Sequence, residues 1–174
     1  MVPETCENKD IRLYKAVEFP HKWKFYSTIF ENINAADSTI FEKNGYWWLF
    51  TNIDTTNSKD YCTELFIFYA SNPLSGEWIG HPKNPVLCDS SNARMGGILF
   101  DNTSVYRVSQ RQGFDMYGQA ANINKITHLS TTDYVEETES TIEPLFYKDL
   151  CGTHHMHGND NVTVFDFVEI GRLK

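Results

Sequence analysis

Five polar residues stand beside short apolar segments in a pattern that could do chemistry. Asp37 directly precedes the run STIF, Arg94 precedes the run ending in GGILF, and His154, His155 and His157 lie in GTHHMH. A carboxyl group or an imidazole can transfer protons, and an arginine fork binds carboxylates, phosphates or paired hydroxyls. These residue types predict a polar site for an anionic or polyhydroxylated group.

The histidine segment argues against a three-imidazole metal site. On a strand, side chains alternate, so His155 and His157 would share one face and His154 the other. No HExxH motif or compatible cysteine spacing accompanies them. We therefore expect no resident cofactor, and a metal ion at His155 stays open as an alternative.

The elements that position these residues read as strands. Short runs of aromatic and β-branched residues are broken every few positions by Asn, Gly, Pro, Asp or Ser, and none shows about ten residues of helical periodicity. Asn44-Gly45 indicates a tight hairpin, a second short turn is expected over 101–103, and residues 131–139 could hold one helical turn. We predict an all-β fold with strands over 11–17, 38–41, 46–52, 64–71, 98–100, 104–109, 122–128 and 162–169.

The strand pattern also repeats. LYKAVEFPHKW and IFYASNPLSGEW share a strand, a proline-containing loop and a tryptophan, with Tyr14 and Tyr69 55 positions apart. This period favours a β-propeller of about three blades, each a four-stranded antiparallel sheet. We expect one incomplete propeller domain over 1–174, with units 1–36, 37–92, 93–151 and 152–174. Inner strands line the channel of a propeller, so the polar residues should converge there, and two open blade faces would favour self-association.

Adjacent tryptophans fit this architecture. Alternation should send Trp47 and Trp48 into opposite faces of one sheet, and Trp23 and Trp78 at equivalent repeat positions are expected in the core.

Composition narrows the partners. The chain has 174 residues and a formal charge of -8, which argues against nucleic acid. It has no apolar run of roughly 20 residues and no signal-peptide pattern at MVPETCENKD, so we expect no transmembrane segment and a cytoplasmic location. Cys6, Cys62, Cys88 and Cys151 are widely spaced without CxxC, which predicts free thiols rather than a zinc or redox site.

Several ordered motifs carry a family resemblance. MVPETCENKDIRLYKAVEFPHKW, DSTIFEKNGYWWLF, ELFIFYASNPLSGEWIGHPKNPV, ARMGGILF, SVYRVSQ and GTHHMH together resemble the propeller domain of the glucosamine inositolphosphorylceramide transferase N-terminal type. That domain is similar to the five-bladed propellers of glycoside hydrolase family 43 and β-fructosidase-like enzymes. The resemblance implies that the first one to two blades would precede Met1.

The resemblance assigns roles to the strand-start residues. It implies that Asp37 is a catalytic channel aspartate that orients the general acid, and the alternative is a turn cap. The hydrolase base would lie upstream of Met1, and the segment SSNARMGG carries Arg94 where an acid would be expected. Because arginine cannot transfer a proton at neutral pH, sugar binding is favoured over hydrolysis by two carboxylates.

Three further residues match the family pattern and join the predicted substrate-binding set. Glu4 could reach the channel mouth or be solvated, and Arg107 and Gln110 in YRVSQ could contact a ligand or bond to neighbouring protein groups.

The remaining candidates are rings at the rim and in the channel. His154 and His155 could hydrogen-bond sugar hydroxyls or close a seam between blades, and a channel metal ion remains an alternative. Tyr61, Phe114 and Tyr117 lie in polar loops and could stack on sugar faces.

Together these features predict a carbohydrate-active propeller module for a sugar or glycolipid head group, fused to or partnered with a glycosyl- or formyltransferase. The alternatives are a non-catalytic interaction module and a family 43-like hydrolase.

Overall fold

The computed structural model describes residues 1–75, 77–112, 117–159 and 161–171. Apart from one 3-10 turn, η1 (Cys6–Asn8), every regular element in these ranges is a β-strand, which confirms the predicted all-β class. None of the described segments forms a helix long and apolar enough to cross a membrane. The strands are β1 (Asp10–Glu18), β2 (Lys22–Glu31), β3 (Ala35–Lys43), β4 (Tyr46–Ile53), β5 (Glu64–Ala70), β6 (Ile79–Gly80), β7 (Leu87–Cys88), β8 (Met95–Asp101), β9 (Ser104–Arg111), β10 (Ala120–Leu129), β11 (Tyr134–Ile142), β12 (Leu150–Gly152), β13 (Met156–Gly158), β14 (Thr163–Phe165) and β15 (Val168–Glu169).

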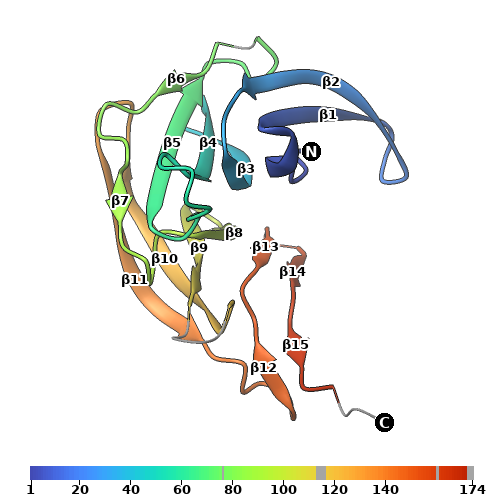
Figure 1. Cartoon of the computed structure of the whole chain (residues 1–174), viewed down its shortest axis with the longest axis vertical. Helices are drawn as coiled ribbons and strands as arrows, with labels where there is room; N and C mark the ends of the chain where they lie inside the picture. Colours follow the sequence, from blue (N-terminus) through green and yellow to red (C-terminus); the bar gives the residue numbers. More distant parts are fainter. Residues whose placement is uncertain (76, 113–116, 160, 172–174) are drawn as a thin grey trace.

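The strands form sheets that follow one another along the chain. β1 pairs with β2; β3, β4, β5 and β6 form an antiparallel run, with β7 also on β5; and β8, β9, β10 and β11 form a second such run. β13 adds to β8 as a parallel neighbour, β14 follows β13, and β12 pairs with β15. Figure 1 shows the sheets arranged around a common centre, with β3, β8 and β13 on the inner side.

Tight polar turns set the register of the two long sheets. Asn44 and Gly45 connect β3 to β4 with φ of 55° and 77°, and Asn102, with φ of 44°, lies in the turn between β8 and β9. Asparagine and glycine tolerate this left-handed backbone, which matches the twist of a two-residue hairpin. Both predicted hairpins are confirmed.

The helical turn expected over residues 131–139 is wrong. This segment enters strand β11, which pairs antiparallel with β10 from Tyr134 opposite Leu129 to Ile142 opposite Ala121. Along this edge strand Glu137 is exposed, whereas Glu136 turns inward to Arg107 and is 8% exposed. Pairing with β10 therefore outweighs local preference here, as is common for strands.

Two apolar clusters hold the sheets together. One contains Trp48 and Phe50, and the other contains Leu49 with Trp47 packed against it. The alternation predicted for the two tryptophans is confirmed, so the strand β4 supplies both clusters. Trp78 is buried as expected, whereas Trp23 is only partly covered because it lies near the end of the β1–β2 hairpin.

Candidate functional site

Asp37 lies in an irregular stretch at the start of β3. The register between β3 and β4 shifts between Ala36 and Thr39, and Asp37 has φ of 54°. Its backbone N–H donates to Glu4 Oε2 at 2.8 Å instead of to a neighbouring strand. A bulge redirects a side chain at a strand end, and aspartate tolerates this backbone better than most residues.

Arg94, which precedes β8, meets Asp37 directly. Its Nε donates to Asp37 Oδ2 at 2.8 Å, and the two side chains are 15% and 26% exposed. Nη1 lies 3.4 Å from Cys62 Sγ, and the guanidinium carbon lies 4.9 Å from the centre of the Tyr117 ring. The Arg94 guanidinium is thus covered on one side by the ring of Tyr117, a residue that is 57% exposed.

Gln110 completes the network around Asp37. Its Nε2 donates to Asp37 Oδ2 at 3.3 Å and to the Met95 carbonyl oxygen at 2.6 Å. The side chain is 1% exposed, so it is a fixed part of the floor beneath the pair. Asp37 therefore accepts from an arginine and an amide that approach from two neighbouring strand regions.

The electrostatics of Asp37 combine opposing effects. Burial raises the pKa of Asp37 above its ordinary value, and the charge of Glu4 adds to this. Arg94 lowers that pKa by charge and hydrogen bonding, and His155 lowers it by charge, but the net direction is upward. Asp37 holds its proton more readily than a solvated aspartate.

Glu4 belongs to the same cluster rather than to solvent alone. One carboxylate oxygen accepts the N–H of Asp37 and the other accepts the N–H of Cys6 at 2.7 Å. Glu4 is itself exposed, and its carboxylate lies against the Asp37 backbone.

The three histidines divide as the alternation predicted. His155 and His157 line one hollow of about 340 Å³ together with residues 38–40 of β3 and the first two residues of the chain. His154 lies on the other side, edge-on to Tyr117 with ring centres 5.1 Å apart. The hollow has β3 on one wall and the histidine strand on the other.

Asp166 fixes the histidine segment and was missed by the sequence analysis. Its Oδ1 accepts the backbone N–H groups of His154 and His155 at 2.9 Å each. Its Oδ2 lies 2.7 Å from His154 Nδ1, a contact that does not meet hydrogen-bond geometry. Nothing in the local pattern VFDFV marks this aspartate, because its partners are more than ten positions away.

Gly97 allows β13 to approach β8. Its φ is 121°, and a side-chain carbon at this position would collide with the carbonyl oxygen of Met156. Glycine is the residue that accepts both conditions. The pair of glycines in MGGILF is the sequence signal of this approach.

Arg107 is sealed inside the second long sheet. It is 0% exposed and forms a two-pronged contact with Glu136, through Nε at 2.7 Å and Nη2 at 2.5 Å, while Nη2 also donates to the Asn92 carbonyl oxygen. Burial acts to lower the pKa of Arg107, but Glu136 and Tyr134 raise it above its ordinary value. The structure thus places Arg107 in the protein-bonding role that the sequence left open.

Of the other two aromatic residues predicted at the rim, Tyr61 contacts Cys6. The Tyr61 hydroxyl lies 3.0 Å from Cys6 Sγ. Hydrogen bonding with Cys6, burial and the charges of nearby acidic groups raise the pKa of Tyr61 to about 12. Phe114 falls outside the described residues. All four cysteines are free thiols, with Cys88 the exposed one.

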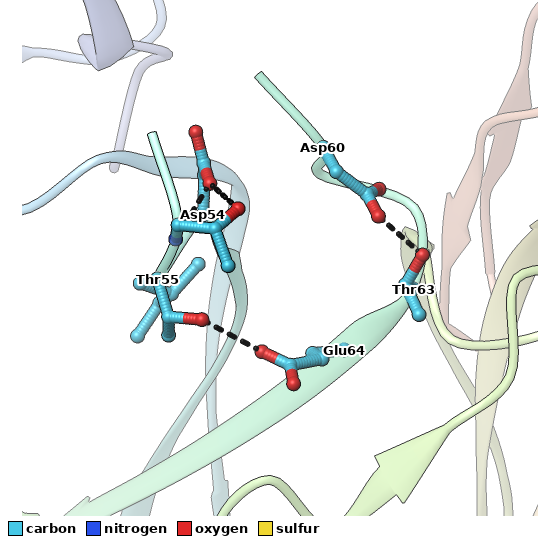
Figure 2. Close-up of a pocket in the computed structure, with 7 residues that line it drawn as sticks. Asp54, Thr55, Asp60, Thr63 and Glu64 are labelled. Atoms are coloured by element: carbon cyan, nitrogen blue, oxygen red, sulfur yellow. Dashed lines mark hydrogen bonds between the residues drawn. The ribbon is translucent and has the colours of Figure 1, made fainter. Parts of the chain in front are cut away.

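A second hollow, of about 210 Å³, is lined by the acidic loop after β4 (Figure 2). Asp54 accepts from the N–H groups of Thr56, Ser58 and Lys59; burial acts to raise the pKa of Asp54, but these bonds lower it overall. Asp60 bonds to the N–H of Cys62. Within the described ranges, no three or more His, Cys, Asp or Glu side chains are arranged to hold a metal ion. The carboxylates of Asp54 and Asp60 thus order the loop in which Cys62 contacts Arg94.

Comparison with known proteins identifies the family. The family model described as "Glucosamine inositolphosphorylceramide transferase 1, N-terminal" matches residues 1–158. This chain belongs to that family. Proteins named glucosamine inositolphosphorylceramide transferase 1 are similar to it: one from Arabidopsis thaliana is 39% identical over 140 residues, and one from Oryza sativa subsp. japonica is 34% identical over 139. Each alignment covers 78% of this chain but 18% of the relative. No solved structure matches the chain.

Membership in the glucosamine inositolphosphorylceramide transferase 1 N-terminal family confirms the first part of the resemblance, the likeness to this N-terminal domain. The matched range contains the central residues Glu4, Asp37, Arg94 and Gln110 and the histidine segment, whereas Asp166 lies beyond it.

Proposed function

We propose that this chain is a carbohydrate-binding module that recognises the head group of a glycolipid at its centre. The relatives are named for a transferase of glucosamine and inositolphosphorylceramide, and we transfer to this chain only the class of ligand that this name contains. Because the chain spans 18% of their length, the transfer reaction itself would require other parts of such a protein.

The observation that carries the proposal is the open ion pair beneath an aromatic ring. Asp37 and Arg94 offer an acceptor and a planar set of donors, Gln110 holds the acceptor, and the half-exposed Tyr117 provides a flat apolar face. Sugars present hydroxyl pairs at their edges and C–H groups on their faces, which match these two kinds of surface.

The proposed architecture is a partial five-bladed propeller related to glycoside hydrolase family 43. The two long sheets would be consecutive blades within 37–92 and 93–151, with β1–β2 and the β13–β14 hairpin as parts of further blades in 1–36 and 152–174. This arrangement is supported by the order of the sheets and by the inner position of β3, β8 and β13 (Figure 1).

Binding suits this site better than hydrolysis by two carboxylates. Asp37 is tied to Arg94 and Gln110, and Arg94 occupies the position where the family 43 pattern would place an acid. Hydrolysis remains the second candidate because the raised pKa of Asp37 favours proton transfer. In that case Asp37→Asn would abolish sugar release from a glycoside panel.

Calorimetry with glucosamine, myo-inositol and myo-inositol phosphate tests the binding proposal. We expect at least one of them to bind, and the double variant Arg94→Ala/His155→Ala to weaken binding at least tenfold. Arg12→Ala is the matched control, because Arg12 forms a similar pair with Asp10 in the first sheet. Equal binding by the double variant and the control would contradict a central site, as would no binding by the wild-type chain.

A further inference from the structure

The β1–β2 hairpin carries apolar side chains into solvent at its end. Phe19 is 78% exposed and Val17 is 64% exposed. In Figure 1 this hairpin extends away from the other sheets. We call residues 15–24 the hairpin tip.

The aromatic groups of the hairpin tip are held in place. Trp23 Nε1 donates to the Pro20 carbonyl oxygen at 2.9 Å, and the rings of Phe19 and Trp23 meet edge-on with centres 6.1 Å apart. His21 N–H closes the turn onto the Glu18 carbonyl oxygen at 2.8 Å. An ordered turn that presents a phenyl ring to water loses little further entropy when the ring is buried.

The hairpin tip is also basic, although the chain is acidic. It contains three lysines against one glutamate, whereas the whole chain has a charge of -8. Lys22 is paired with Glu18 at 2.5 Å. Lys15 and Lys24 stand directly opposite each other in the β1–β2 register, both exposed, and neither has an ion-pair partner among the described residues. Like charges placed opposite each other destabilise a strand pair unless an anion lies nearby.

We propose that the hairpin tip docks onto the surface of an anionic lipid bilayer. Aromatic side chains interleaved with lysines are the composition that lies at the boundary between headgroups and acyl chains. Phe19 and Val17 would enter that boundary, and Lys15 and Lys24 would face the anionic headgroups. The inference does not rest on sugar binding at the centre, and it would hold the chain at a surface where glycolipid head groups are found.

A second exposed apolar region supplies the internal control. Leu145 is 83% exposed and Tyr147 is 69% exposed in the segment between β11 and β12. The exposed Lys148 there is followed directly by Asp149, so this region lacks the basic excess of the hairpin tip. It offers similar apolar exposure without the same charge.

Vesicle flotation tests the proposal with the full chain. We use vesicles of phosphatidylcholine alone and vesicles in which about a third of the lipid is phosphatidylserine. The wild-type chain is expected to float with the anionic vesicles, and binding should weaken as salt is raised. Trp23 emission should shift to shorter wavelength on binding.

Two variants separate the charge and apolar contributions. Lys15→Glu/Lys24→Glu should lower partitioning by at least about 25-fold, since each lysine near such a surface is worth roughly fivefold. Phe19→Ser should lower it by about tenfold through lost apolar burial. Leu145→Ser and Lys148→Glu, which change matched groups in the control region, should bind as wild type.

Circular dichroism of each variant checks folding, and all the replaced side chains are exposed. Absence of wild-type binding to anionic vesicles overturns the proposal, as does full binding by both hairpin variants. Concentration-dependent dimers that are lost in Phe19→Ser, without vesicle binding, would assign the hairpin tip to a protein contact and overturn it too.

Discussion

Two arginine–carboxylate pairs in this chain have the same chemistry but different surroundings. Arg107 and Glu136 are 0% and 8% exposed, and the arginine also donates to the Asn92 carbonyl oxygen. Arg94 and Asp37 are 15% and 26% exposed, and their aromatic neighbour Tyr117 faces solvent. Burial, rather than residue type, separates an arginine that stabilises a sheet from one that a ligand could reach.

Breaking the buried Arg107–Glu136 pair should lower the stability of the fold more than any other change proposed here. Arg107→Ala would leave Glu136 buried without its cation, so we expect a loss of about 3–5 kcal/mol in the free energy of unfolding. Urea denaturation followed by circular dichroism measures it. Replacing both members, as in Arg107→Met/Glu136→Gln, should cost less than the single change. A loss below about 1 kcal/mol for Arg107→Ala would show that the pair does not hold the sheet.

Breaking the partly exposed Arg94–Asp37 pair should affect ligand binding more than folding. We expect Arg94→Ala to lose at most about 1 kcal/mol in unfolding free energy, because water can reach Asp37. The same change should weaken sugar binding at least tenfold in calorimetry. If Arg94→Ala destabilised the chain as strongly as Arg107→Ala, the two pairs would both be structural.

The ring of Tyr117 over Arg94 should contribute to binding but little to folding. Tyr117→Ala should weaken binding by roughly fivefold, the scale of a cation–π and stacking contact at a partly exposed site, and leave the melting temperature nearly unchanged. Tyr117→Phe is the matched control and should keep most of the affinity. Full affinity in Tyr117→Ala would remove the ring from the proposed site.

The contribution of Asp37 to the stability of the fold should depend weakly on pH. Because the pKa of Asp37 is raised above 3.8 in the folded chain, its protonated form contributes stability below pH 3.8, and this contribution is lost as pH rises through the folded pKa. The melting temperature of wild type minus that of Asp37→Asn should therefore fall as pH rises from 3.8 towards neutral. A difference that grows with pH would mean that Arg94 outweighs burial.

Local features of the fold were predictable, and distant partnerships were not. The hairpin at Asn44-Gly45 and the opposite faces of Trp47 and Trp48 follow from neighbouring residues, and both are confirmed. The strand β11 was partly misread because its glutamates favour no particular element until β10 pairs with it.

In the candidate site, too, residue types were predictable from the sequence but their distant partners were not. Asp37 and Arg94 were recognisable as polar residues before inner strands, yet their direct bond spans 57 positions of the chain. Asp166 escaped notice because its importance lies in two backbone N–H groups near position 154, which side-chain types do not reveal. Arg107 was left between two roles because burial depends on how sheets pack, and Glu136 belongs to a later strand.

Gly97, which has no side chain, controls the position of His155 and His157. Gly97 admits the Met156 carbonyl, and Met156 stands between the two histidines that line the central hollow. A methyl group added there would displace the segment 155–157, which carries both imidazoles. In a family member with a larger residue at this position, we therefore expect other side chains in place of His155 and His157 at the hollow, even if Asp37, Arg94 and Gln110 were retained.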